Sequence, residues 1–140
     1  MYSALQSAHS IFAYIVLAVL FLASVNAIMG IVSKKIFTDK DLRISLFALI
    51  LSHMQLLLGL ILYFVSPLGS ASLGNMNKVF RLTSLEHPLI NIIALALITI
   101  GWSKHKKEES NNGKFKKIAL FYSIGLLLIL SRIPWSSWMS

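Results

Sequence analysis

The chain has 140 residues, of which 56% are apolar and 13% are charged, and its mean hydropathy is +0.75. Because soluble domains carry about 25% charged residues, this composition excludes almost every class of water-soluble globular protein. At about 20 apolar residues per crossing of a bilayer, the length accommodates four membrane spans and no separate soluble domain. The chain contains no cysteine, which excludes disulfides, thiolate nucleophiles and cysteine-ligated metal centres.

Four apolar stretches separated by polar segments predict an all-α fold, that of a polytopic membrane protein built as an antiparallel four-transmembrane-helix bundle. We expect one domain over residues 1–140, with spans at about 9–33, 44–66, 84–103 and 117–133. At the start of the third span, Ser84 is expected to cap the helix. Pro88 is expected in its first turn, where a missing N–H costs no hydrogen bond.

The distribution of basic residues predicts the orientation in the membrane. Of the 13 Lys and Arg residues, four lie in segment 34–43 and six lie in segment 104–117. Since basic residues collect on the cytoplasmic side of membrane proteins, we expect these segments inside the cell and both termini outside. The formal net charge of +8 is then explained by contact with membrane lipid rather than with nucleic acid.

Histidines in the predicted spans are the main candidates for function, because an unpaired imidazole is costly in lipid. His9 lies at the start of the first span and His87 at the start of the third. These two spans run in the same direction, so both rings reach a similar depth near the outer face. Two imidazoles on facing helices can bind the iron of haem b from opposite sides. The alternatives are that His9 is an ordinary interfacial residue and that His87 is a hydrogen-bonded residue at a helix start.

Several residues fit the surroundings that a haem needs. Gly59 and Gly125 remove side-chain bulk where a macrocycle could approach, although small residues also serve ordinary helix packing. Arg81 and Arg132 lie at the outer level, where cations would bind the propionates. For Arg132, pairing with a propionate, pairing with Glu86 and extension of its side chain towards water remain open.

His53 is harder to assign, because at 1.5 Å per residue it lies about 15 Å along its helix from Arg43, near the middle of the bilayer. Three roles are open: a structural hydrogen bond, a proton-relay step, or ligation of an alternative or second metal site. The candidate hydrogen-bond partners are Gln55, Asn26 and Thr99. We favour the structural role. His105 lies in the basic segment and is expected to be solvated.

Several motifs together identify a resemblance. They are His9-Ser10, the run Ser52–Pro67, Arg81 followed by Glu86-His87-Pro88, Ile98–Gly101, and Ile133-Pro134-Trp135. With these stretches, which extend over nearly the whole chain, the protein resembles a family of small four-helix membrane proteins of Bacteroidota that are labelled cytochrome b. A more distant resemblance, to one half of the haem A synthase bundle, implies that His9 and His87 are axial ligands of a b-type haem.

The leading hypothesis is a b-type cytochrome of the bacterial inner membrane that transfers one electron at a time. Its expected cofactor is haem b, and its expected partners are membrane lipid, a quinone and a periplasmic or membrane redox partner. Whether it is itself an enzyme or a redox component of an oxidoreductase system stays open. Two alternatives are a cofactor-free membrane subunit or scaffold of a larger complex, and a haem carrier.

Overall fold

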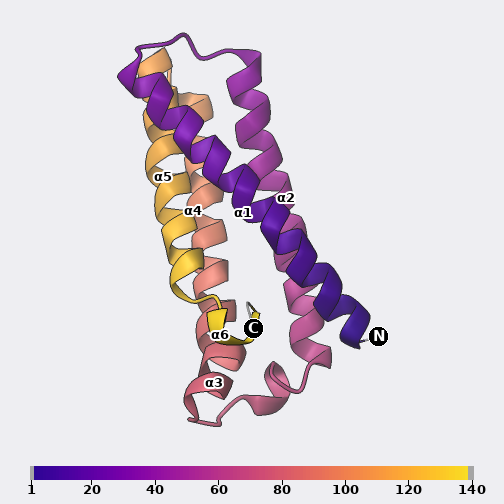
Figure 1. The fold of residues 1–140 in the computed structure, drawn as a ribbon. Coiled ribbons are helices and arrows are strands. Elements are labelled where there is room, and N and C mark those ends of the chain that lie inside the picture. Colours follow the sequence, from indigo (N-terminus) through magenta and orange to yellow (C-terminus); the bar gives the residue numbers. More distant parts are fainter. Residues whose placement is uncertain (1, 139–140) are drawn as a thin grey trace.

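The computed structural model describes residues 2–138, and it contains helices and connections but no strand in that range. The all-α prediction is therefore confirmed. The four long helices are α1 (Tyr2–Val32), α2 (Asp39–Val65), α4 (His87–Lys107) and α5 (Asn111–Ser131). Shorter elements are the 3-10 turn η1 (Ser70–Ser72), α3 (Lys78–Arg81), the π-helical turn η2 (Leu82–Glu86) and α6 (Trp135–Trp138). The long helices pack along one another as a helical bundle (Figure 1).

Within the described residues, three helical segments are long and apolar enough to cross a membrane. They are α1, α2 and the continuous helical run Lys78–Lys107, which joins α3, η2 and α4. The first three predicted spans correspond to these segments. Helix α5 is not among them because Lys114, Lys116 and Lys117 occupy its first two turns, so that its uncharged part is Ile118–Ser131.

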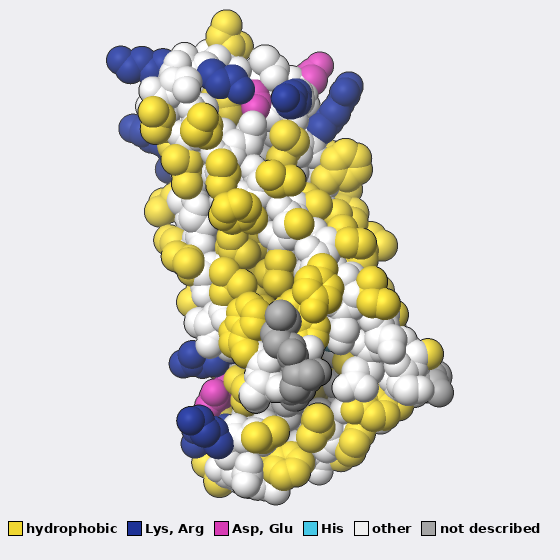
Figure 2. Space-filling view, viewed as in Figure 1, with side chains coloured by type: hydrophobic (Ala, Val, Ile, Leu, Met, Phe, Trp, Pro, Cys, Tyr) yellow, Lys and Arg dark blue, Asp and Glu magenta, His cyan; other side chains and the backbone are white. Residues whose placement is uncertain are grey.

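The bundle has two distinct ends. The start of α1, the connection 66–86 and α6 lie together, at what we call the histidine end (Figure 1). The connections 33–38 and 108–110 lie at the opposite end, which we call the lysine end. Most of the Lys and Arg side chains visible in Figure 2 gather at the lysine end. Helices α1 and α4 therefore start at the same end, as the spacing of the spans predicts.

The predicted start of the third span is wrong. The helical run begins at Lys78 after Asn77, whose side chain accepts a hydrogen bond from the Val79 N–H. Ser84 is not a cap, because its hydroxyl donates to the Phe80 carbonyl inside the run. The sequence reasoning placed the start too late because the π-helical turn hides the helical period between Leu82 and Glu86.

Pro88 consequently lies inside a continuous helical run rather than in a first turn. Proline has no N–H, so the carbonyl of Ser84, four residues earlier, lacks its usual α-helical donor. The Tyr63 hydroxyl of α2 donates to this carbonyl at 2.8 Å. A side chain from a neighbouring helix thus compensates for the proline, which is how such breaks are tolerated in apolar surroundings.

A tight turn joins α1 to α2. Lys34 has a φ of 52°, in the left-handed region that usually carries glycine. The Lys35 N–H donates to the Gly30 carbonyl at 3.1 Å and the Lys34 N–H to the Ile31 carbonyl at 3.3 Å. These are the two hydrogen bonds of a Schellman motif, and they satisfy carbonyls that the end of α1 leaves free.

Asp41 fixes the start of α2 against α1. Its side chain is buried, and one carboxylate oxygen accepts hydrogen bonds from the Thr38 N–H and hydroxyl at 2.9 and 3.0 Å. The other oxygen accepts from the Asn26 side-chain amide at 2.9 Å. This carboxylate therefore acts as a helix cap and as a link between two helices.

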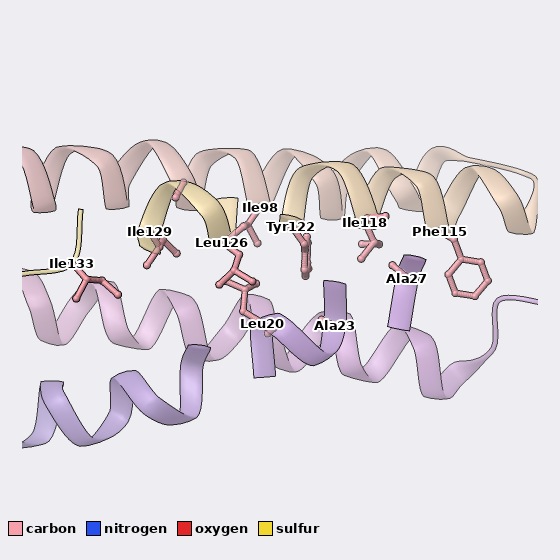
Figure 3. Packing of buried hydrophobic residues seen from close by; sticks show 13 residues of the cluster. Leu20, Ala23, Ala27, Ile98, Phe115, Ile118, Tyr122, Leu126, Ile129 and Ile133 are labelled. Carbon is pink, nitrogen blue, oxygen red and sulfur yellow. The ribbon is translucent and has the colours of Figure 1, made fainter. Parts of the chain in front are cut away.

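Helix α5 packs against α1 and α4. Its buried face carries Phe115, Ile118, Tyr122, Leu126 and Ile129, which meet the small side chains of α1 in Figure 3. The buried residues of α1 all lie in its later part, between positions 16 and 30. Helix α1 crosses the bundle obliquely, so its first turns lie beside α2 and away from α5 (Figure 1). This divergence leaves space at the histidine end.

Candidate functional site

A cavity of about 580 Å³ occupies this space at the histidine end. It is lined by residues of α1, α2 and α4, and also by the chain around α6, where Trp138 packs on Tyr14 with ring centroids 4.7 Å apart. Both His9 and His87 line it. Its volume falls within the range of about 300–1,000 Å³ that is typical of small-molecule and cofactor sites.

The two histidines that the sequence singled out lie close together. The centroids of the His9 and His87 rings are 6.4 Å apart, and the ring planes are inclined at 78°. A metal held between two imidazole nitrogens at about 2 Å each places the ring centroids about 6 Å apart, once the radius of each ring is added. The observed spacing therefore suits two axial ligands on one metal centre.

Hydrogen bonding favours one tautomer of His87. Its Nδ1 lies 3.0 Å from the backbone carbonyl oxygen of Arg132. The Asn91 side-chain nitrogen lies 3.2 Å from the same Nδ1, but because a carbonyl can only accept, the shorter contact to Arg132 favours the tautomer with the proton on Nδ1. The Asn91 side-chain amide donates to the His87 carbonyl from one turn further along α4. Metal-bound histidines commonly donate their second N–H to a backbone carbonyl in this way.

His9 lies against α2. The Gln55 side-chain amide donates to the His9 carbonyl at 2.8 Å, and a Cβ atom added to Gly59 would lie 3.1 Å from Cε1 of the His9 ring. Within residues 2–138, two buried atoms at this contact have no hydrogen-bond partner: Nδ1 of His9 and Oε1 of Gln55. Buried polar atoms are rarely unpaired without a reason. Nδ1 of His9 is thus a buried ring nitrogen against α2 whose hydrogen-bonding capacity is unused.

The two predicted glycines have different roles. Gly59 lines the cavity as expected, but the His9 ring rather than open space lies next to it. The prediction that Gly125 makes room for a macrocycle is not supported, because a Cβ there would lie 2.7 Å from Cγ1 of Ile98 and 3.2 Å from the Ala94 carbonyl oxygen. Gly125 instead permits the close approach of α4 and α5.

The two predicted arginines bind a carboxylate of the chain. Nε of Arg81 lies 2.8 Å from one oxygen of Glu86, and Nε of Arg132 lies 3.7 Å from the other. Of the three possibilities considered for Arg132, pairing with Glu86 is the one observed. Neither arginine is among the described residues that line the cavity. The two guanidinium groups and the one carboxylate together have a net charge of +1 near the rim of the cavity.

His53 does not line the cavity, in the part of the chain that the structure describes. Its Nδ1 lies 2.8 Å from the Leu49 carbonyl oxygen, and its Nε2 lies 3.4 Å from the Thr99 hydroxyl. Thr99 is one of the predicted hydrogen-bond partners, so the structural role is the one that the geometry supports. No group of three or more His, Cys, Asp or Glu side chains in the described residues could hold a metal ion beside it.

The prediction that His105 is solvated is wrong. Helix α4 extends to Lys107, so His105 belongs to a helix rather than to a loop. Its side chain is buried between Phe37 and Trp102, with ring centroids at 5.4 and 4.6 Å, and its Nδ1 bonds to the Trp102 carbonyl. Phe37 lies far away in sequence, in the connection between α1 and α2. The charges around His105 in the sequence could not predict that Phe37 packs on it.

Two further site residues carry weaker sequence signals. Asn91 follows His87 by four residues, which places it on the same face of a helix. Gln55 precedes Gly59 by four residues on α2 and therefore shares the face that contacts His9. The sequence signal for Asn91 and for Gln55 is therefore a spacing of four residues from His87 and from Gly59. This spacing places each amide on the right helix face, but it does not predict which atom the amide binds.

Comparison of the chain with protein-family models, with curated proteins and with solved structures found no match.

Proposed function

We propose that the chain is a multi-pass protein of the bacterial inner membrane that crosses the bilayer four times, with its lysine end on the cytoplasmic side. Three helical segments of suitable length and apolarity support this topology. Helix α5 packs along them with its three lysines at the lysine end. The excess of basic residues at that end fits the known bias of cytoplasmic loops.

We further propose that the cavity at the histidine end binds one haem b, with His9 and His87 as axial ligands. The observation that carries this proposal is the 6.4 Å separation of the two ring centroids in one cavity. A porphyrin supplies four nitrogen ligands, so two protein ligands complete the coordination of its iron.

Each neighbouring residue has a defined part in this proposal. The Arg132 carbonyl holds the Nδ1 proton of His87 and leaves Nε2 for the iron. With the His9 ring turned away from Gly59, Nδ1 would donate to the unpaired Oε1 of Gln55 and Nε2 would be left to bind the iron. The excess positive charge around Glu86 favours anionic propionates near the rim of the cavity.

The function that follows is one-electron transfer. Bound haem b supplies a centre that accepts and releases one electron, and the protein tunes its potential through ligation, burial and nearby charge. With the histidine end outside, the natural donors and acceptors are a membrane quinol and a redox partner at the periplasmic face.

Visible absorption of the detergent-purified chain, produced with haem supplied, tests this function. We expect about one haem per chain with the low-spin spectrum of two imidazole ligands. His9→Ala and His87→Ala should each lose that spectrum. His53→Ala is the matched control and should keep it, because His53 does not line the cavity in the described chain.

A colourless wild-type protein that co-purifies with a larger assembly would replace the proposal with a cofactor-free subunit. A haem that leaves the wild-type protein within minutes to an apo-acceptor would indicate a haem carrier. A spectrum unchanged in both His9→Ala and His87→Ala would refute the ligand assignment.

A further inference from the structure

A second cavity, of about 640 Å³, lies between α1 and α2 at the lysine end, and none of its lining residues is shared with the histidine cavity. Its apolar walls include Leu22, Met29 and Phe47, which are 59%, 56% and 58% exposed. Its polar residues lie towards one end, where Lys35 and Lys40 border it. The site is therefore an apolar groove with a cationic mouth.

We propose that this groove binds an anionic phospholipid, with an acyl chain along the apolar walls and the phosphate beside Lys35 and Lys40. The groove extends along α1 from Val19 to Ser33, which is about 21 Å of helix. One leaflet contributes about 15 Å of hydrocarbon. The groove is therefore long enough for an acyl chain to extend through the depth of one leaflet.

The charges at the mouth favour an anion. Within residues 2–138, Lys40 makes no ion pair, and Nζ of Lys35 lies 3.9 Å from one Asp41 oxygen. The Asp41 carboxylate is already bound by the Thr38 and Asn26 donors, so it neutralises at most one of the two lysines. A lipid phosphate would supply the missing negative charge, as at other basic pockets between membrane helices.

The same charges argue against a second copy of the chain in this groove. Two copies in one membrane have the same orientation, so a symmetric contact would bring both sets of lysines to one level of the interface. Such juxtaposition of like charges opposes association. The lipid proposal depends on insertion into a membrane but is independent of haem binding.

Native mass spectrometry of the detergent-solubilised full chain tests the proposal, with phosphatidylglycerol and phosphatidylcholine of identical acyl chains as probes. We expect one retained phosphatidylglycerol per chain and at least fivefold weaker retention of phosphatidylcholine. Lys40→Gln should weaken phosphatidylglycerol binding about fivefold, and Lys35→Gln with Lys40→Gln about 25-fold, because each basic residue near a membrane surface contributes about 1 kcal/mol. Lys104→Gln with Lys107→Gln, at the same end but outside the groove, should bind like the wild type.

Equal retention of the two lipids, or equal losses in the groove and control variants, would overturn the proposal. Leu22→Trp, which fills the groove, should abolish retention of phosphatidylglycerol while the helical circular dichroism is kept. A dimer that persists in the double lysine variant and disappears in Leu22→Trp would instead assign the groove to a second copy. The haem content of every variant should equal that of the wild type, so failure of this proposal is distinguishable from failure of the haem proposal.

Discussion

The two ends of the bundle surround their imidazoles differently. At the lysine end, His105 is enclosed by two aromatic rings and its Nδ1 bonds to a backbone carbonyl. At the histidine end, His9 and His87 line a cavity, and Nδ1 of His9 has no partner in the described chain. The same fold can therefore enclose a histidine completely. The open space around the histidine pair suits a group that is not part of the chain.

The difference arises from how the helices approach one another. Towards the lysine end, small residues of α1 meet the buried face of α5, and Asp41 links α1 to α2. Towards the histidine end, α1 leaves α5, and the cavity lies among α1, α2 and α4. Packing thus supplies stability towards the lysine end, while the cavity that both histidines line lies at the histidine end. Variants that affect only one end test this division.

Asp41→Ala should have the largest effect, and it should lower stability without changing haem binding. It removes a buried carboxylate that accepts hydrogen bonds from the half-buried Asn26 amide and from the exposed Thr38 N–H, which should lower the free energy of unfolding by about 3 kcal/mol. Denaturant titration in detergent followed by circular dichroism measures this loss. Asp39→Ala, at an exposed position in the same turn, should cost less than about 1 kcal/mol. A haem content that falls with Asp41→Ala in protein that remains folded would contradict the separation of the two ends.

Gly59→Val should act on binding alone. Its branched side chain would displace the His9 ring, because a Cβ alone already lies 3.1 Å from that ring. We expect haem occupancy to fall at least tenfold, which corresponds to about 1.4 kcal/mol.

Gly125→Ala is the matched control, because its Cβ would press on Ile98 between α4 and α5. It should lower stability by about 2 kcal/mol through overpacking while leaving haem occupancy unchanged. Titration of haem into both proteins measures the contrast, and the reverse pattern would refute the assignment of the two glycines.

Lys34→Gly should have the smallest effect, and it should be stabilising. Lys34 occupies a left-handed conformation at the end of α1, and glycine there removes strain of ~1 kcal/mol. Lys34→Ala is the control, since it removes the charge but retains the strained conformation. Equal unfolding midpoints for the two variants would show that charge, and not backbone conformation, governs this turn.

Much of the fold follows from hydropathy and local signals. The first two predicted spans agree with α1 and α2 to within about one or two turns, because long apolar runs bounded by charge or by proline leave little choice. The third span was placed too late, since Asn77 caps the run and η2 interrupts the α-helical period. The fourth predicted span corresponds to α5, but the lysines at the start of this helix leave it an apolar part shorter than those of the other three segments.

From the sequence, the site could be predicted only where two residues lie at the same depth in the bundle. His9 and His87 begin two co-directional spans, so their proximity follows from topology. Other contacts depend on tertiary packing that no local pattern encodes. The approach of Ile98 to Gly125 and the cover of His105 by Phe37 are two examples.

The most direct test of the paired-ligand proposal is chemical rescue of His87→Gly. In the haem-loaded variant, the low-spin absorption spectrum should be lost and should return when free imidazole is added, because the deletion leaves room for an exogenous ligand in the same position. His53→Gly should show the wild-type spectrum with or without imidazole. A His87→Gly protein that keeps the wild-type low-spin spectrum before imidazole is added would contradict the proposal.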